Sequence, residues 1–214
     1  MPTPPARAGT KGVPRAARER QMLAAATEEF GRRGYEATTM AAVAARVGVT
    51  KPLLHQYFGS KQDLYLACLD PVGRRLLDAV RSAMAEPGPG APPTPLRVLS
   101  ALFTALDGQR AAWSVLYDAT LPPGSDAALR AAHYRDALDD LAAVGTADLL
   151  RSAGSADPLD ADALTYAWRG LCTALVRWWV THPEQTAQAM TERCARLFTA
   201  GRRILAADEE GTGP

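Results

Sequence analysis

The chain is poor in aromatic residues and contains no long uninterrupted apolar run. Phe, Trp and Tyr make up 7% of the 214 residues, although apolar residues as a whole make up 47%. Alanine, leucine and arginine dominate, which favours helices over sheets. No stretch of about 18 uncharged apolar residues occurs, so we expect no membrane span. The length permits one domain, or two closely packed ones, with a sizeable core.

Cysteine is also scarce. The three cysteines, Cys68, Cys172 and Cys194, are far apart and lie in apolar helical patterns. This arrangement predicts buried thiols of a cytosolic protein and favours neither a disulfide nor a metal site. The N-terminal residues contain prolines and glycines where a signal peptide would have its apolar core. We therefore expect a soluble cytoplasmic protein that uses no metal and no cofactor.

Lysine is confined to one end of the chain, since all three lysines lie within the first 61 residues. Residues 1–65 hold ten basic and five acidic side chains, whereas the remainder holds 14 basic and 18 acidic ones. A basic head on an acidic body is typical of a module that binds a polyanion such as nucleic acid. The alternative is an ordinary solvated charge asymmetry.

Glycine, proline and hydroxyl residues divide the chain into segments with helical periodicity. They predict an all-α fold of about nine helices, at 15–33, 39–47, 50–58, 60–84, 95–109, 110–120, 125–153, 160–181 and 183–207. We expect Gly34 to end the first helix, a bend at Asp70-Pro71 in the fourth, and a possible interruption at Gly145. The predicted organisation is a disordered arm (1–14), a three-helix head (15–62), a helical bundle (63–207) and a disordered tail (208–214).

Residues 39–58 follow the pattern of a helix-turn-helix. Ala44 is small where two helices must approach closely, Gly48 permits the turn, and Thr50 caps the second helix. This arrangement leaves the second helix free to enter a major groove of DNA. Such patterns also arise by chance in alanine-rich helical proteins.

The segment Arg32–Leu69 resembles the head of the TetR family of transcriptional regulators. The matching residues occur in the family's order over about 55 residues of the chain, and they are Phe30, Gly34, Tyr35, Thr38, Thr39, Val43, Ala44, Gly48, Val49, Thr50, Tyr57, Phe58, Ser60, Lys61 and Leu64. The rest of the chain is similar only in its helical organisation. The resemblance implies a DNA-binding head followed by a body that dimerises and encloses a small-molecule pocket.

The resemblance also implies which residues meet DNA. They are Thr39, Thr50, Lys51, Pro52, Leu53, His55, Gln56, Tyr57 and Lys61. Lys51 and Gln56 have the donors to read base edges, and Leu53 is placed to contact a thymine methyl group. Thr39 and Lys61 are expected at phosphates, where contacts position the protein without specifying sequence.

His55 is a departure from the family, which usually has a tyrosine at this point of the recognition helix. Tyr57 stands two residues further on. A histidine can still donate to phosphate, but its charge varies near neutral pH, so the hypothesis is that operator binding tightens at acidic pH. The alternative is that His55 is a partly exposed residue without a special role.

Two helices of the body show apolar stripes too wide for one core contact, which favours burial against a partner. The candidate interface residues of this homodimer are Leu175, Trp178, Trp179, Cys194, Leu197 and Phe198. Other side chains combine apolar bulk with polar tips, as in an effector pocket. They are Phe103, Trp113, Tyr117, His133, Tyr134, Trp168 and Cys172, each of which is individually as well explained as ordinary core.

Together these features predict a dimeric repressor that binds two-fold related half-sites of double-stranded DNA and is released by a small, largely apolar effector. An enzyme is not expected, because no phosphate loop, nucleophile elbow or metal-ligand spacing is present. The alternative function is a helical ligand-binding or interaction protein with a vestigial DNA-binding head.

Overall fold

The computed structural model describes residues 14–85 and 90–210, over which the chain forms nine α-helices and no β-strand. The helices are α1 (Arg15–Ala37), α2 (Met40–Val47), α3 (Lys51–Phe58), α4 (Lys61–Met84), α5 (Thr94–Leu106), α6 (Ala112–Leu116), α7 (Asp126–Ser152), α8 (Pro158–Val180) and α9 (Ala187–Glu210). Residues 1–13 of the expected arm and 211–214 of the expected tail lie outside the described residues. The all-α prediction is confirmed.

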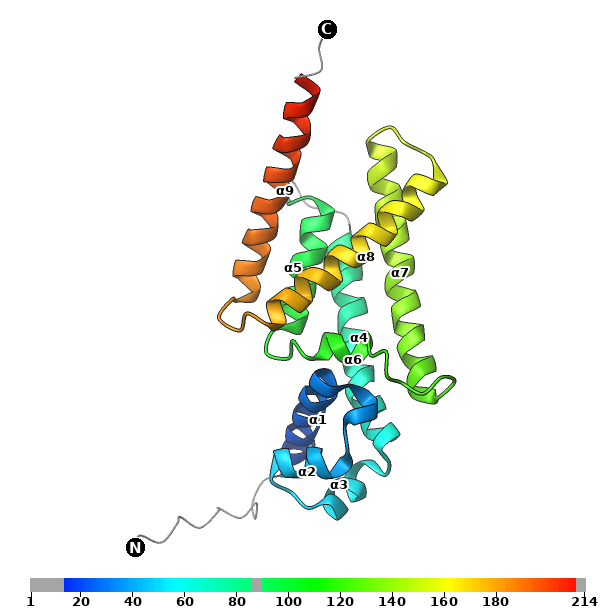
Figure 1. Cartoon of the computed structure of the whole chain (residues 1–214), viewed down its shortest axis with the longest axis vertical. Helices are drawn as coiled ribbons and strands as arrows, with labels where there is room; N and C mark the ends of the chain where they lie inside the picture. Colours follow the sequence, from blue (N-terminus) through cyan, green and yellow to red (C-terminus); the bar gives the residue numbers. More distant parts are fainter. Residues whose placement is uncertain (1–13, 86–89, 211–214) are drawn as a thin grey trace, which may run out of the picture.

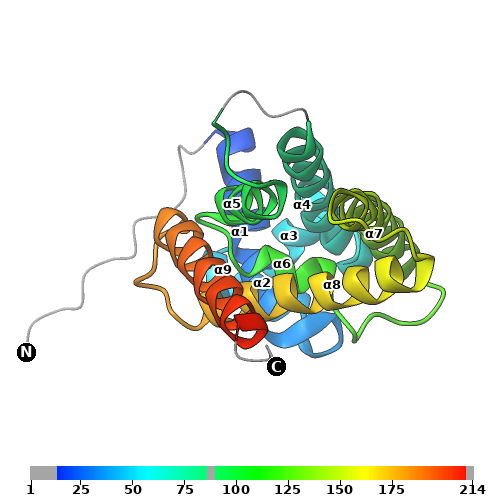
Figure 2. The ribbon, with the colours of Figure 1, turned by 90° about the horizontal axis from the view of Figure 1, so that it is seen from above.

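The molecule has a small lower part and a larger upper part that share one helix (Figure 1). α1, α2 and α3 gather at the lower end, and α4 begins beside them and runs upward into the body. α4 packs against α1, α5, α6 and α7, while α9 packs on α5 and α8 on α7 (Figure 2). The expected boundary near residue 62 therefore falls within the first turn of a continuous helix.

Side-chain caps explain why the short helices begin where they do. The hydroxyls of Thr39, Thr50 and Ser60 accept the backbone N–H groups of Ala42, Leu53 and Asp63. Ser60 and Asp63 form a complete capping box at the start of α4, as the sequence predicts. These caps satisfy backbone donors that have no partner within the helix.

Two helices differ from their predicted extents for local reasons. At Gly34 the regular helix of α1 is interrupted, as the sequence predicts: this residue adopts φ 76° and ψ 170°, a conformation available essentially to glycine, and a short helical piece counted with α1 continues beyond the kink to Ala37. α6 is only five residues long, not eleven, because the chain leaves the helix at Tyr117. The Asp118 side chain there accepts the N–H of Thr120 at 2.7 Å and holds a turn in place of the helix.

The remaining helices of the body are close to their predicted positions. α4 is continuous through Pro71, and α7 is continuous through Gly145. α9 begins at Ala187 instead of residue 183, since the Thr186 hydroxyl accepts the N–H of Ala189. It ends at Glu210, so residues 208–210 are helical and do not belong to a tail.

Candidate DNA-binding surface and ligand cavity

α2 and α3 form a tight helix-turn-helix built around Gly48. This glycine adopts the left-handed conformation, and both Gly48 N–H and Val49 N–H donate to the Ala44 carbonyl at 3.0 Å. Ala44 and Leu54 are buried where the two helices meet. In this arrangement one face of α3 packs on the core and the opposite face is exposed to solvent.

An acidic side chain inside the head ties α1 to α2. Glu29 is buried, and its carboxylate forms ion pairs with Arg33 on α1 (3.0 Å) and Arg46 on α2 (2.8 Å). A buried carboxylate is tolerated only when it is paired in this way. Arg33, near the end of α1, thus has a partner in the fold.

The nine residues predicted to meet DNA lie on one exposed end of the head. Six of them are exposed: Thr39, Thr50, Lys51, Pro52, His55 and Gln56. Leu53, Tyr57 and Lys61 are half-buried, and the first two pack against the edge of the core. Because the threonine caps use their hydroxyl oxygens as acceptors, each keeps an O–H that it can donate to phosphate.

Lys61 is fixed by the end of α1 instead of extending freely into solvent. Its Nζ donates to the Glu36 carbonyl at 3.3 Å and lies 4.3 Å from the centre of the Tyr35 ring. Partial burial lowers the Lys61 pKa, an effect that the charges of Glu36 and Asp118 oppose. The ammonium group therefore has a defined position beside α3.

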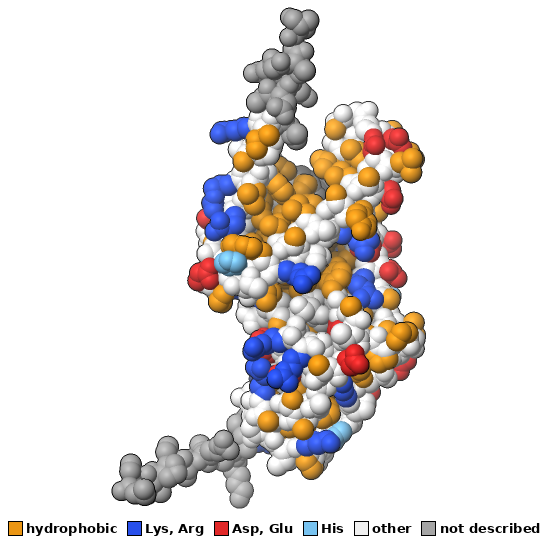
Figure 3. Space-filling model, in the orientation of Figure 1, with side chains coloured by type: hydrophobic (Ala, Val, Ile, Leu, Met, Phe, Trp, Pro, Cys, Tyr) orange, Lys and Arg blue, Asp and Glu red, His pale blue; other side chains and the backbone are white. Residues whose placement is uncertain are grey.

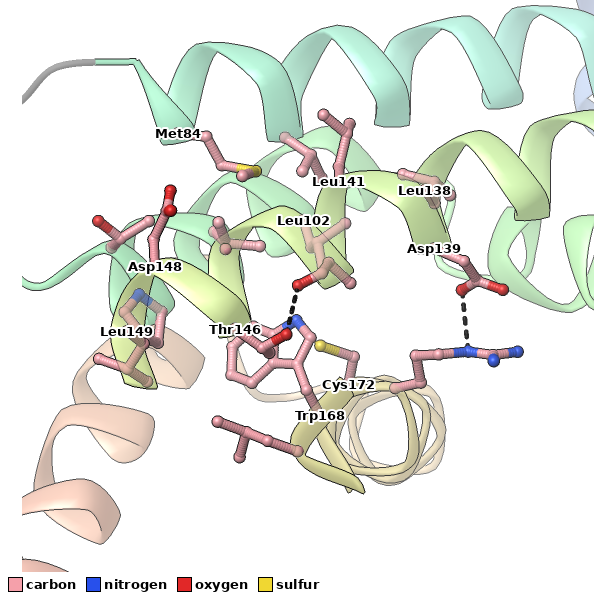
Figure 4. A pocket seen from close by; sticks show the side chains of 18 of the residues that line it. Met84, Leu102, Leu138, Asp139, Leu141, Thr146, Asp148, Leu149, Trp168 and Cys172 are labelled. Carbon is pink, nitrogen blue, oxygen red and sulfur yellow. Dashed lines mark hydrogen bonds and ion pairs between the residues drawn. The ribbon is translucent and has the colours of Figure 1, made fainter. Parts of the chain in front are cut away.

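A cavity of about 330 Å³ lies in the body between α4, α5, α6, α7 and α8 (Figure 4). Its volume is within the range of roughly 300–1,000 Å³ that is typical of small-molecule sites. Four of the seven predicted pocket residues line it: Trp113, Tyr117, Trp168 and Cys172. Burial raises the pKa values of Tyr117 and Cys172 to about 12, so both side chains are uncharged at neutral pH.

The other three predicted pocket residues lie elsewhere. Phe103 is fully buried against Trp179, with ring centres 5.4 Å apart. Tyr134 packs over Gly73 and donates its hydroxyl to Asp70 at 3.1 Å. His133 is exposed.

α7 supplies a wall of the cavity whose residues are not among the predicted ones. Leu138, Leu141 and Thr146 face the same space as Trp168 and Cys172 in Figure 4. Leu141 and Thr146 stand at the i+3 and i+8 positions relative to Leu138, a spacing typical of one broad helix face, and this pattern is a signal that the sequence contains.

One ion pair also lies in the cavity wall. Asp139 of α7 accepts from Arg169 Nε of α8 at 2.8 Å. Burial raises the pKa of Asp139, and the Arg169 charge opposes that shift. The wall is thus mainly apolar, with one charged bridge between two helices.

The predicted interface residues divide into exposed and buried ones. Trp178 and Leu197 are 38% and 54% exposed. Trp179 and Cys194 are buried within the protomer, and Trp179 donates its Nε1 to the Gln185 carbonyl at 2.8 Å, so neither is free to meet a partner. Leu175 and Phe198 are half-buried.

α8 and α9 nevertheless expose several large apolar side chains. Figure 3 shows hydrophobic side chains gathered over α8 and α9 in the upper half of the face. Leu171 on α8 and Ile204 on α9 are not among the predicted interface residues, but both side chains are exposed.

Comparison with known proteins agrees with this geometry. The sequence model of the family described as "Bacterial regulatory proteins, tetR family" matches residues 22–68. A TetR-like transcriptional regulator from Rhodococcus sp. RHA1 has a similar structure, with a TM-score of 0.60 and 30% identity over 84% of this chain and 92% of that one. The chain belongs to the TetR family. The structure of the transcriptional regulator FadR from Bacillus subtilis, in complex with stearoyl-CoA, is similar in fold with a TM-score of 0.55 and 16% identity over 81% and 95% of the two chains.

Curated relatives match over about a third of this chain. The HTH-type transcriptional activator FasR of Mycolicibacterium smegmatis is 47% identical over 72 residues, or 34% of this chain and 33% of FasR. The HTH-type transcriptional regulator BetI of Brucella suis is 39% identical over 72 residues, or 32% and 36% of the two chains. The chain thus matches about a third of the length of these relatives.

Neither a membrane-spanning helix nor a cluster of metal-binding side chains is found in the described part of the chain. Among residues 14–85 and 90–210, no helix has the length and apolar character that crossing a membrane requires. Over the same residues, no three His, Cys, Asp or Glu side chains come together as a metal site needs.

Proposed function

We propose that this TetR-family protein is a sequence-specific DNA-binding regulator of transcription. The observation that carries the proposal is the open face of α3, which exposes Lys51, His55 and Gln56 between two capped helix starts. Lys51 and Gln56 supply donors for base edges in the major groove. The caps at Thr39 and Thr50 and the ammonium of Lys61 supply phosphate contacts around them.

The protein acts as a homodimer. Supporting this, the apolar faces of α8 and α9 expose Leu171, Trp178, Leu197 and Ile204, and large exposed apolar side chains that lie together mark contact surfaces. Two helices from each protomer then form a four-helix interface. Two-fold symmetry presents a pair of α3 helices to two related half-sites on DNA.

The protein represses its promoter and is released by a small, largely apolar molecule that occupies the cavity. The mainly apolar wall supports a ligand of this class, and a structural neighbour holding stearoyl-CoA supports it at the level of the fold. Release requires that the ligand bind the DNA-free arrangement more tightly than the DNA-bound one. Because FasR is named as an activator, the direction of regulation needs its own measurement.

DNA binding is tested with the purified protein and a fluorescent fragment from upstream of its own gene, over a series of salt concentrations. We expect specific binding whose affinity falls linearly with salt on logarithmic axes. A scrambled fragment of equal length is the control. Equal binding to both fragments, or no salt dependence, contradicts the proposal and favours a ligand-binding protein with a vestigial head.

The direction of regulation is tested with a reporter joined to the same upstream fragment. Deletion of the gene raises reporter expression if the protein is a repressor and lowers it if the protein is an activator. Complementation with a double variant, Lys51→Ala and Gln56→Ala, distinguishes the effect of losing the contacts to base edges from the effect of losing the whole protein.

A further inference from the structure

The segment from Ala111 to Thr120 touches both the ligand cavity and the head. Trp113 and Tyr117 form part of the cavity wall, and their rings are stacked with centres 4.5 Å apart. The chain then leaves α6 and enters the turn held by Asp118. The same short stretch of chain therefore borders the cavity through Trp113 and Tyr117 and contacts α1 of the head through the residues at its two ends.

Asp118 connects this segment to the end of α1. The carboxylate is 7% exposed, and its Oδ2 accepts the N–H of Tyr35 at 2.6 Å. Its Oδ1 accepts both the N–H and the hydroxyl of Thr120 at 2.7 Å. The Thr120 hydroxyl oxygen in turn accepts the N–H of Glu36 at 3.1 Å. Two consecutive backbone donors of the head are thus bound by two side chains of one turn.

The packing between α1 and this segment leaves no room for sliding. A Cβ atom on Gly31 would lie 2.3 Å from the Ala111 carbonyl oxygen, and one on Gly34 would lie 2.7 Å from Thr120 Oγ1. At Gly31 the two backbones therefore meet directly, and at Gly34 the side chain of Thr120 occupies the space that a Cβ would need. A displacement of the segment must move the end of α1 with it, because packed contacts of this kind transmit shifts and do not absorb them.

The end of α1 in turn positions groups at the DNA-binding surface. Tyr35 and the Glu36 carbonyl hold the Lys61 ammonium. The Thr38 hydroxyl donates to the Gly34 carbonyl at 2.7 Å, and Thr38 directly precedes Thr39, the cap of α2. The turn at Gly34 therefore sets the location of one expected phosphate contact and the start of the helix-turn-helix.

We propose that Asp118 is the positioning residue that couples occupancy of the cavity to DNA binding, through its hydrogen bond to the backbone of Tyr35. This inference rests on the proposed function. A molecule that fills the cavity presses on Trp113 and Tyr117, shifts the turn at Asp118, and rotates the end of α1 with Lys61 and the α2 cap. Asp118 lines neither the cavity nor the DNA-binding surface, and acts through the end of α1; its Oδ2 also lies 3.5 Å from the Tyr65 hydroxyl of α4.

The test uses a side chain to fill the cavity, so that no ligand need be known. Ala142 of α7 lines the cavity, and Ala142→Phe puts a ring into it. Ala143 is exposed and does not line the cavity, so Ala143→Phe is the matched control. Each is made in the wild-type chain and together with Asp118→Asn, which places an amide donor opposite a backbone N–H. Asp107→Asn is the second control, because the exposed Asp107 bonds within its own loop.

Affinity for the upstream DNA fragment is measured for every combination at one salt concentration. We expect Ala142→Phe to weaken binding by about fivefold or more in the wild-type and Asp107→Asn chains. In the Asp118→Asn chain the same substitution should change the affinity by less than about twofold, the signature of coupling in a double-mutant cycle. Ala143→Phe should have no comparable effect.

Hydrogen exchange gives a second readout that a general loss of stability would not reproduce. Ala142→Phe should speed exchange of the Tyr35 and Glu36 amides while leaving the amides inside α9 unchanged. Thr120→Val offers a milder variant should Asp118→Asn fail to fold, because it removes the acceptor of the Glu36 N–H and the hydroxyl that donates to Asp118, but leaves the bond from the Tyr35 N–H to Asp118.

An equal effect of Ala142→Phe with and without Asp118 overturns the inference, as does an absence of any effect in the wild-type chain. Both outcomes leave specific DNA binding intact. Failure of every variant, and of the wild type, to bind the fragment contradicts instead the proposed function.

Discussion

The Nδ1 atom of His55 lies 2.6 Å from the carbonyl oxygen of Gly59, the residue that ends α3. A neutral imidazole in this position carries its proton on Nδ1 and leaves Nε2 as an acceptor, which phosphate oxygens repel. Proton uptake turns Nε2 into a donor and leaves the bond to Gly59 intact. The ring therefore changes from repelling to attracting a phosphate without moving.

His55 should make DNA binding depend on pH. The affinity for the upstream fragment should be higher at acidic than at alkaline pH, because only the protonated ring can donate to a phosphate through Nε2. A charge-assisted contact of roughly 1.5 kcal/mol corresponds to about tenfold in affinity. Anisotropy titrations at constant ionic strength measure it. His55→Asn, which keeps a donor for the Gly59 carbonyl but does not titrate, should show a flat profile, and a profile equal to that of the wild type refutes the role.

Replacing Lys61 should weaken DNA binding without changing sequence preference. Loss of one phosphate contact lowers the slope of log affinity against log salt by about 0.9. The measurement is a salt series on the upstream fragment and on single-base variants of it. Lys61→Arg is the control, since it keeps the charge near Tyr35. Altered preference among the base variants would assign Lys61 to base reading instead.

Gly34 and Gly48 should differ in their tolerance of alanine although both have positive φ. At Gly48 a Cβ would meet nothing within 4 Å, so Gly48→Ala carries only backbone strain of roughly 1 kcal/mol. At Gly34 the added Cβ also lies 2.7 Å from Thr120 Oγ1. We expect Gly34→Ala to cost at least about 2 kcal/mol in the free energy of unfolding by urea. Equal losses at both positions would mean that the contact with Thr120 is not tight.

A charge at Leu197 should separate the dimer. Leu197→Glu places a carboxylate on the exposed apolar face of α9, and the expected result is a monomer by light scattering coupled to size exclusion. Leu129→Glu on α7 is the matched control, because Leu129 is 61% exposed and Leu197 is 54% exposed. The control should keep the oligomeric state of the wild type. A Leu197→Glu protein that keeps the oligomeric state of the wild type would place the interface elsewhere.

Cys172 should react slowly with iodoacetamide, and a ligand should protect it. Burial raises the pKa of Cys172 to about 12, so the reactive thiolate is about one part in ten thousand at pH 8. The rate should rise about tenfold per pH unit between pH 8 and 10. Any molecule that occupies the cavity should slow labelling of Cys172, which lines it, while leaving Cys68 unchanged. Mass spectrometry of the labelled peptides distinguishes the two sites.

The helix-turn-helix and the exposed face of α3 are predictable from the sequence because their determinants are local. Thr39, Gly48, Thr50 and Ser60 act on backbone groups within a few residues of themselves. Such signals are present in the order of the residues and need no knowledge of the rest of the fold. The same holds for the start and length of α4.

The short length of α6 and the continuation of α1 beyond Gly34 cannot be predicted from such local signals. The turn at residues 117–120 is held by the carboxylate of Asp118. One oxygen of this carboxylate accepts the backbone N–H of Tyr35, which lies 83 residues away in the chain. The cavity wall likewise combines α7 with α8, and neither helix alone shows which of its apolar residues face a void and which face solid core. Phe103 and Trp113 look alike in sequence, yet only Trp113 lines the cavity.

The close contact of Gly31 with Ala111, together with that of Gly34 with Thr120, restricts how such a protein can be recombined. A chimaera that fuses a foreign head to this body near residue 62 would separate the two glycines from the turn that fits them. Any side chain larger than hydrogen at either position would push the head and the body apart. Ligand binding in the body would then no longer affect DNA binding by the head. A working hybrid has to exchange residues 31–36 and 111–120 as one unit, although some 75 residues of sequence lie between them.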